Sequence, residues 1–247
     1  MENRPVQELS DSPQPTVQAQ APSVAPARST RSIRSYVVRA GRITAAQQRA
    51  LDELWPRYGV EYAPEPLQLA RLFGRRAPCA LEIGFGNGQN LAERAMREPA
   101  TDFIGLEVHQ PGIGQLLLAA ARAGCDNLRV IAHDAVEVLE RQISIGSLDE
   151  VQILFPDPWP KKRHHKRRLL RKPFIDLLAS RLRPGGRLHI ATDWEPYAEQ
   201  IEAELGACPA LHAASTPVAR TATRFERRGE RLGHRVREFL LVRTATK

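Results

Sequence analysis

The chain has 247 residues, 42% of them hydrophobic, which is enough for one α/β domain with a buried core and some additional segments. It carries 36 Lys and Arg against 28 Asp and Glu, and eight of the basic residues fall between positions 161 and 172, so the positive excess is local and favours contact with nucleic acid. The sequence contains neither the roughly 20 apolar residues that span a bilayer nor a signal-peptide core, so we expect a cytoplasmic enzyme without a membrane partner.

The first segment, residues 1–35, is rich in Pro, Gln, Ser and Ala and shows no apolar periodicity. Such a segment cannot bury enough surface to offset its chain entropy, so we expect a disordered tail. Residues 36–77 are expected to form a helical cover for the domain that follows. Within this cover, Thr44 suits the N-cap of a helix that we expect to end at the Trp55-Pro56 step, because Pro disfavours helix continuation.

In residues 78–247, short apolar runs alternate with longer helical patterns, as a parallel sheet with crossover helices requires. The expected strands are residues 79–83, 103–108, 128–132, 150–155, 187–191 and 236–242. The expected helices are residues 88–97, 111–123, 135–142, 169–182 and 195–205, and a turn is expected at residues 184–186. This order predicts a single Rossmann-like α/β domain with a mostly parallel, doubly wound sheet and helices on both faces.

A glycine loop follows the first expected strand. Glu82 lies near the end of that strand, and Gly84, Gly86 and Gly88 come after it. Glycine lets the backbone approach a bound nucleoside closely before a helix begins. The third glycine falls one position earlier than in the dinucleotide fingerprint, which argues against a nicotinamide dehydrogenase.

Acidic side chains follow the next three strands, at Glu107, Asp134 and Asp157. In open α/β sheets, ligands bind outside the carboxyl ends of the strands. Glu107 suits the two hydroxyls of a ribose and Asp134 suits an adenine amino group, although an acid after a strand is often only a helix N-cap. Together with Glu82, these acids fit the cationic S-adenosylmethionine better than a pyrophosphate, and their order is that of a class I methyltransferase.

Residues 155–168 run from an acid between prolines into a basic block. The prolines hold the backbone at Asp157 in a stiff form, which can aim a reactive side chain. The alternative is a proline-rich loop followed by a solvated basic helix face. For Trp159, stacking on a base and packing in the core are both open. His164 and His165 are adjacent and the three cysteines are far apart, so we expect neither a metal site nor a disulfide framework.

Taken together, these features resemble the bacterial tRNA (guanine-N7-)-methyltransferase family. The runs that carry the resemblance are EIGFGNG (82–88), EVHQPG (107–112), HDA (133–135), FPDPWPKKRHHKRR (155–168), ATDWEPY (191–197), TRFE (223–226) and RLGH (231–234). The resemblance implies a class I fold, S-adenosylmethionine as cofactor, tRNA as partner, and methyl transfer to N7 of a variable-loop guanine, which forms 7-methylguanosine. We also expect a monomer without an obligatory protein partner.

The resemblance further implies roles for individual residues. The cofactor site is expected to comprise Glu82, Gly84, Gly86, Gly88, Glu107, Asp134 and Asp157, with Asp157 also the catalytic residue. The expected substrate contacts are Lys161, Asp193, Thr223, Arg224, Phe225 and Glu226, and the expected RNA contacts are Arg163, His164, His165, Lys166, Arg167 and Arg168. At Arg224 the family usually has Lys, which has the same charge but a different donor geometry.

Guanine N7 carries an in-plane lone pair and no proton, so its methylation needs no general base. We therefore expect catalysis from in-line positioning and from Asp157, whose carboxylate would stabilise the cationic product base. Asp157 and Asp193 both suit the Watson–Crick edge of guanine, and Asp193 has a structural alternative as a helix N-cap. Two other functions stay open: methylation of an exocyclic amino group, which must also lose a proton, and non-catalytic RNA binding.

Overall fold

The computed structural model describes residues 35–36, 42–214, 226, 233 and 235–245. All of these residues belong to one compact unit, residues 33–247. The expected disordered tail, apart from its last residue, and the expected substrate contacts at positions 223–225 lie outside the described residues. Within the described part of the chain, no helix has the length and apolar character needed to cross a membrane.

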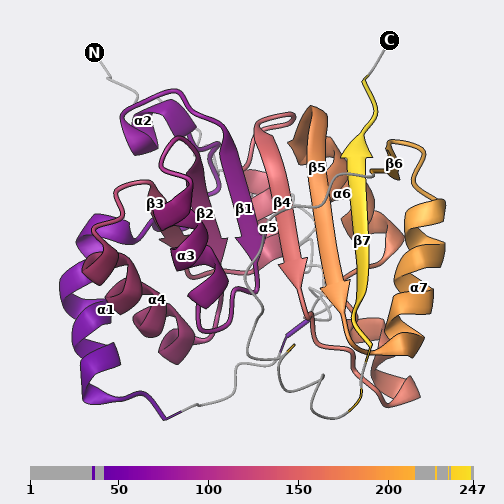
Figure 1. Ribbon diagram of the computed structural model, residues 1–247, viewed down its shortest axis with the longest axis horizontal. Helices are drawn as coiled ribbons and strands as arrows, with labels where there is room; N and C mark the ends of the chain where they lie inside the picture. The colour runs from indigo at the N-terminus through magenta and orange to yellow at the C-terminus, as the bar shows by residue number, and fades with distance from the viewer. Residues whose placement is uncertain (1–34, 37–41, 215–225, 227–232, 234, 246–247) are drawn as a thin grey trace, which may run out of the picture. The chain divides into compact units, whose positions relative to one another are not determined.

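The described strands form one sheet in the order β3-β2-β1-β4-β5-β7-β6 (Figure 1). The strands are β1 (Cys79–Ile83), β2 (Asp102–Leu106), β3 (Leu128–Ile131), β4 (Leu148–Leu154), β5 (Leu182–Thr192), β6 (Leu211–Ala213) and β7 (Arg237–Arg243). Strands β1 to β5 pair in parallel, whereas β7 runs antiparallel to both β5 and β6. The strand order reverses between β1 and β4, so a ligand crevice is expected at the carboxyl ends of these two strands.

Helices cover both faces of the sheet because successive strand residues point to opposite faces. In β1, Leu81 and Ile83 belong to one hydrophobic core, and Ala80 belongs to the other. The core around Ala80 is closed by α1 (Ala45–Tyr58), α3 (Gln89–Arg97) and α4 (Gln110–Ala123). The core around Leu81 is closed by α2 (Leu69–Phe73), α5 (Ala135–Arg141), α6 (Lys172–Arg181) and α7 (Glu195–Gly206) (Figure 1). The predicted α/β class, mostly parallel sheet and helices on both faces are confirmed.

Helix α1 begins where the sequence indicates but ends later. Thr44 Oγ1 accepts a hydrogen bond from Gln47 N (3.2 Å), and Gln47 Oε1 accepts one from Thr44 N (2.9 Å), which forms a capping box. The predicted end at the Trp55-Pro56 step is wrong, because the helix continues through Pro56 to Tyr58. Tyr58 is fully buried, and the chain just after it pairs with β3, so tertiary packing offsets the hydrogen bond that proline cannot donate.

Three further features differ from the expectation. The turn at residues 184–186 lies inside β5, which pairs with β4 at Leu182 and resumes regular pairing at Arg187. Helix α6 starts at Lys172 rather than at residue 169, with a proline in its first turn, because the basic run before it forms a separate 3₁₀ helix, η1 (Lys162–Arg167). Helix α2 and strand β6 were not predicted, since five and three residues are too few to show a period.

Candidate active site

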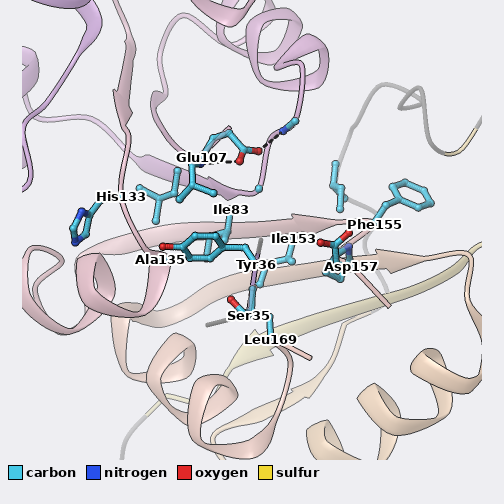
Figure 2. A pocket seen from close by; sticks show the side chains of 16 residues that line it. Ser35, Tyr36, Ile83, Glu107, His133, Ala135, Ile153, Phe155, Asp157 and Leu169 are labelled. Carbon is cyan, nitrogen blue, oxygen red and sulfur yellow. Dashed lines mark hydrogen bonds between the residues drawn. The ribbon is translucent and has the colours of Figure 1, made fainter. Parts of the chain in front are cut away.

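A pocket lies at the carboxyl ends of the central parallel strands (Figure 2). It is lined by Ser35, Tyr36, Ile83, Gly84, Gly86, Leu106, Glu107, Val108, His133, Ala135, Ile153, Leu154, Phe155, Pro156, Asp157 and Leu169. These residues come from the ends of β1, β2 and β4 and the loops after them, from the start of α5, from the segment at residues 35–36, and, for Leu169, from the segment between η1 and α6. The location agrees with the crevice expected from the reversal of strand order.

The glycine loop after β1 depends on close approaches that leave no room for a side chain. Gly88 is the N-cap of α3 at φ 72°, and a Cβ atom built there would lie 2.6 Å from Leu116 Cβ. Gly112, in the first turn of α4, is closer still, since its Cβ would lie 2.0 Å from the Gly86 carbonyl oxygen. Any side chain at Gly112 would therefore push the loop out of place. Gly84 and Gly86 line the pocket, whereas Gly88 is not among the lining residues.

Glu107 presents an oriented carboxylate at the end of β2. Its Oε2 accepts a hydrogen bond from Gly86 N (2.9 Å), and its Oε1 accepts hydrogen bonds from Val108 N (2.7 Å) and His109 N (3.0 Å). An ionised carboxylate has roughly four lone-pair positions, so one stays available for a ligand hydroxyl. The contacts also tie the glycine loop to β2 through the side chain that faces the pocket (Figure 2).

Asp157 lines the same pocket from the loop after β4, and its side chain is exposed. The residues two positions before and after it, Phe155 (φ 54°) and Trp159 (φ 46°), both adopt left-handed backbone conformations. Such conformations cost about 1–3 kcal/mol each for a non-glycine residue, so contacts elsewhere must hold the loop. Phe155 N donates a hydrogen bond to Ala191 O (2.8 Å) in β5, which anchors the start of the loop.

Trp159 packs within the protein. Its Nε1 donates a hydrogen bond to Ser35 O (3.1 Å), the Arg167 guanidinium lies 5.3 Å from its ring centroid, and the His164 ring meets it edge-on at 5.8 Å. These contacts hold the half-buried Trp159 side chain against its own chain. The side chain links η1 to residues 35–36, which form part of the pocket wall.

Two acids expected in the cofactor site are absent from the pocket lining. The Glu82 side chain is 4% exposed and accepts a hydrogen bond from Asn90 Nδ2 (2.8 Å), and burial raises its pKa to about 7. Asp134 caps α5, where it accepts hydrogen bonds from Val136 N (2.8 Å) and Glu137 N (3.3 Å). Neither side chain lines the pocket, although residues on either side of Asp134 do.

The expected substrate contacts that the structure describes do not line the pocket. Lys161 is exposed at the N-cap of η1, and Asp193 is half-buried directly after β5. Asp193 does not hold the N-cap position of α7, which is occupied by Trp194 without a side-chain cap. Glu226 is 8% exposed, whereas Thr223, Arg224 and Phe225 lie outside the described residues.

The expected RNA contacts divide into exposed and buried residues. Arg163 and Lys166 are exposed on η1, while His164, His165 and Arg167 are half-buried. Partial burial, followed by the nearby cations, lowers the pKa of His164 and favours its neutral form. Arg168 is only 4% exposed, so its side chain does not lie on the surface where an RNA contact was expected.

Sequence reasoning missed Ser35 and Tyr36 as pocket residues. Both line the pocket, although position 35 was assigned to the tail and position 36 to the start of the helical cover. A signal was present, because Tyr36 is the first aromatic residue of the chain. An aromatic side chain after a long polar segment marks a place where the chain can bury surface.

The sheet with its antiparallel β7 and the pocket at the ends of β1, β2 and β4 define a class I methyltransferase. A family model described as "Putative methyltransferase" matches residues 76–239. The chain belongs to the tRNA (guanine-N(7)-)-methyltransferase family, as its relatives show.

One such methyltransferase, from Chromohalobacter salexigens, is 48% identical over 244 residues, which cover 95% of this chain and 99% of the relative. Another, from Cronobacter sakazakii, is 52% identical over 223 residues, which cover 87% and 93% of the two chains. Among solved structures, a 16S rRNA (adenine(1408)-N(1))-methyltransferase from Catenulisporales acidiphilia is similar, with a TM-score of 0.51 and 17% identity over 76% of this chain and 94% of that one. At this identity the likeness concerns the fold alone.

Proposed function

We propose that this protein transfers the methyl group of S-adenosylmethionine to N7 of a guanine in the variable loop of tRNA, forming 7-methylguanosine. Family membership supports the reaction. The observation that carries it furthest is the position of Asp157, which lines the pocket and lies only a few residues before the exposed basic surface of η1. The cofactor pocket and the surface suited to tRNA therefore meet at this carboxylate. Action on tRNA also favours a cytoplasmic location.

The described pocket residues fit S-adenosylmethionine. The lining contains the carboxylates Glu107 and Asp157 and neither Lys nor Arg, so it favours a cation and repels a pyrophosphate. The apolar side chains of Ile83, Ile153 and Leu169 offer walls for an adenine ring, and Glu107 has a lone pair for a ribose hydroxyl. When bound, the cofactor supplies a methyl group on a positively charged sulfur.

In this proposal Asp157 acts by electrostatics. N7 needs no base, so the carboxylate has no proton to remove, and it instead stabilises the positive charge that develops on the purine. Its exposure is compatible with this role, because the target base must reach it from outside. Asp193, Lys161 and Glu226 are proposed to hold the guanine. The exposed part of η1 would contact tRNA phosphates, which positions the substrate without reading its sequence.

The test is to incubate the purified protein with S-adenosylmethionine and unmodified bulk tRNA, digest the RNA, and identify methylated nucleosides by mass spectrometry. We expect 7-methylguanosine. Asp157→Asn should lower kcat on the order of 100-fold, as the loss of one preorganised electrostatic group does, with little change in cofactor affinity. Asp126→Asn serves as a control, because this exposed acid lies before β3, at the amino ends of the parallel strands.

Two results would contradict the proposal. A methylated exocyclic amino group would keep the fold and the cofactor but remove the N7 assignment. Near-normal turnover by Asp157→Asn with intact cofactor binding would remove the electrostatic role of the carboxylate.

A further inference from the structure

One basic residue of the segment expected to contact RNA is buried. Arg168 follows η1 directly and is 4% exposed, whereas Lys166, two residues earlier, is exposed. Burying a guanidinium is unfavourable unless other groups in the protein bind it, and desolvation accordingly lowers the pKa of Arg168. The contacts of this side chain should therefore explain its position.

The guanidinium of Arg168 joins two segments that are distant in the sequence. Its Nε donates a hydrogen bond to Pro158 O (2.8 Å) in the loop after β4. Its Nη1 donates to Gln200 Oε1 (2.7 Å) and to Pro196 O (3.3 Å) in α7. The guanidinium carbon also lies 4.8 Å from the centroid of the Tyr197 ring, within range of a cation–π interaction.

Neighbouring contacts strengthen the same connection. Leu170 N donates a hydrogen bond to Tyr197 Oη (3.0 Å), and Gln200 Nε2 donates to Leu170 O (3.4 Å). Gln200 thus accepts from Arg168 and donates to Leu170. The segment after η1 is consequently attached to α7 by several bonds, and Arg168 extends this attachment to the loop after β4.

The two joined segments carry the two acids proposed to act on the guanine. Pro158 directly follows Asp157, and α7 begins two residues after Asp193. The loop around Pro158 contains the left-handed residues Phe155 and Trp159, so its conformation must be held by its surroundings. The Pro158 carbonyl belongs to the peptide bond that joins Pro158 to Trp159, one residue beyond Asp157, so this hydrogen bond holds the loop that carries Asp157.

We propose that Arg168 is a positioning residue for methyl transfer rather than an RNA contact: it sets the place of Asp157 relative to α7 and Asp193. This inference rests on the proposed function for the roles of those two acids. Arginine suits the task because its planar fork donates in two fixed directions at once, whereas the ammonium of lysine is a point charge on a flexible stem. Charge alone at this position would not preserve the geometry.

Kinetics of three variants test the positioning role. Arg168→Lys keeps the charge and should lower kcat about 10- to 100-fold with little change in KM for tRNA, since small displacements of reacting groups have effects of this size. Gln200→Leu removes the side-chain acceptor of Arg168 Nη1 but leaves Arg168 itself in place, so it should also lower kcat. The double variant should lose less than the product of the two separate losses, because both act on one network.

Salt dependence of tRNA binding tests the second half of the inference. Lys166→Gln, at an exposed position, should lower the magnitude of the slope of log affinity against log salt by about one, as the loss of a phosphate contact does. Arg168→Gln also removes one positive charge, but at the buried position, and we expect it to keep the wild-type slope. Circular dichroism should show which variants fold, and Gln200→Leu decides the kinetic question if the Arg168 variants do not.

The inference is overturned if Arg168→Gln lowers the slope as much as Lys166→Gln does, or if Arg168→Lys and Gln200→Leu both keep the wild-type kcat. These results differ from a failure of the proposed function, in which the wild-type protein would form no 7-methylguanosine. The salt slopes need no turnover, so they would still show whether Arg168 contacts RNA.

Discussion

The buried carboxyl of Glu82 should make the free energy of unfolding depend on pH, and Glu82→Gln should remove this dependence. Its carboxyl is 4% exposed below the glycine loop, next to Asn90, which also donates a hydrogen bond to Gln152 Oε1 (3.1 Å). Burial is the largest influence on this carboxyl and raises its pKa from 4.5 to about 7, against the opposing effects of Asn90 and Arg94. The folded state therefore binds this proton more tightly than the unfolded state.

The sign and size of the effect follow from that difference. Because the pKa of Glu82 is raised in the folded state, its protonated carboxyl contributes its full stabilisation below pH 4.5. This contribution is lost as the pH rises towards 7. The complete change corresponds to about 3 kcal/mol, of which about 2 to 3 kcal/mol falls between pH 5 and pH 8. Gln cannot ionise, so the free energy of unfolding of Glu82→Gln should rise by this amount relative to wild type over the interval.

Urea unfolding at pH 5 and pH 8 measures this difference directly, and other titrating groups cancel when the variant is compared with wild type. In thermal unfolding of a chain of this size, the same change should appear as a shift in Tm of about 5–10 °C relative to wild type. Glu199→Gln, at an exposed position of α7, controls for the loss of a carboxylate. A stability difference between Glu82→Gln and wild type that is equal at the two pH values would refute the argument that burial governs this carboxyl.

Two substitutions around the pocket test its shape. Gly112→Ala places Cβ 2.0 Å from the Gly86 carbonyl oxygen, so we expect the loop to shift and S-adenosylmethionine to bind at least about tenfold more weakly by calorimetry. Gly206→Ala, whose Cβ meets no atom within 4 Å, should leave the affinity unchanged, and equal affinities for the two variants would contradict the prediction. Tyr36→Ala removes part of the pocket wall and should raise the Kd for the cofactor about tenfold, and a wild-type Kd would exclude Tyr36 from the binding site.

Local patterns in the sequence determined much of this protein. The first strand occupies residues 79–83 as predicted, because a run of apolar residues between turn signals has few alternatives. The capping box at Thr44 and the helix end at Gly124 also depend on residues only a few positions apart. Glu107 and Asp157 meet at one pocket because parallel strands end at the same edge of a sheet. The strand and the helix ends required only short-range chemistry, and the shared edge follows from the parallel, right-handed connections of an α/β sheet.

The tertiary structure decided where individual side chains of the sequence motifs point, for example in the glycine loop and in the basic run. Glu82 and Arg168 belong to segments expected at the ligand and at RNA, yet both are buried by partners far along the chain, Gln152 through Asn90 and Gln200 directly. Tyr36 reaches the pocket from outside the predicted domain. Burial and long-range hydrogen bonds depend on which segments pack together, and a sequence pattern carries no record of a partner that lies tens of residues away.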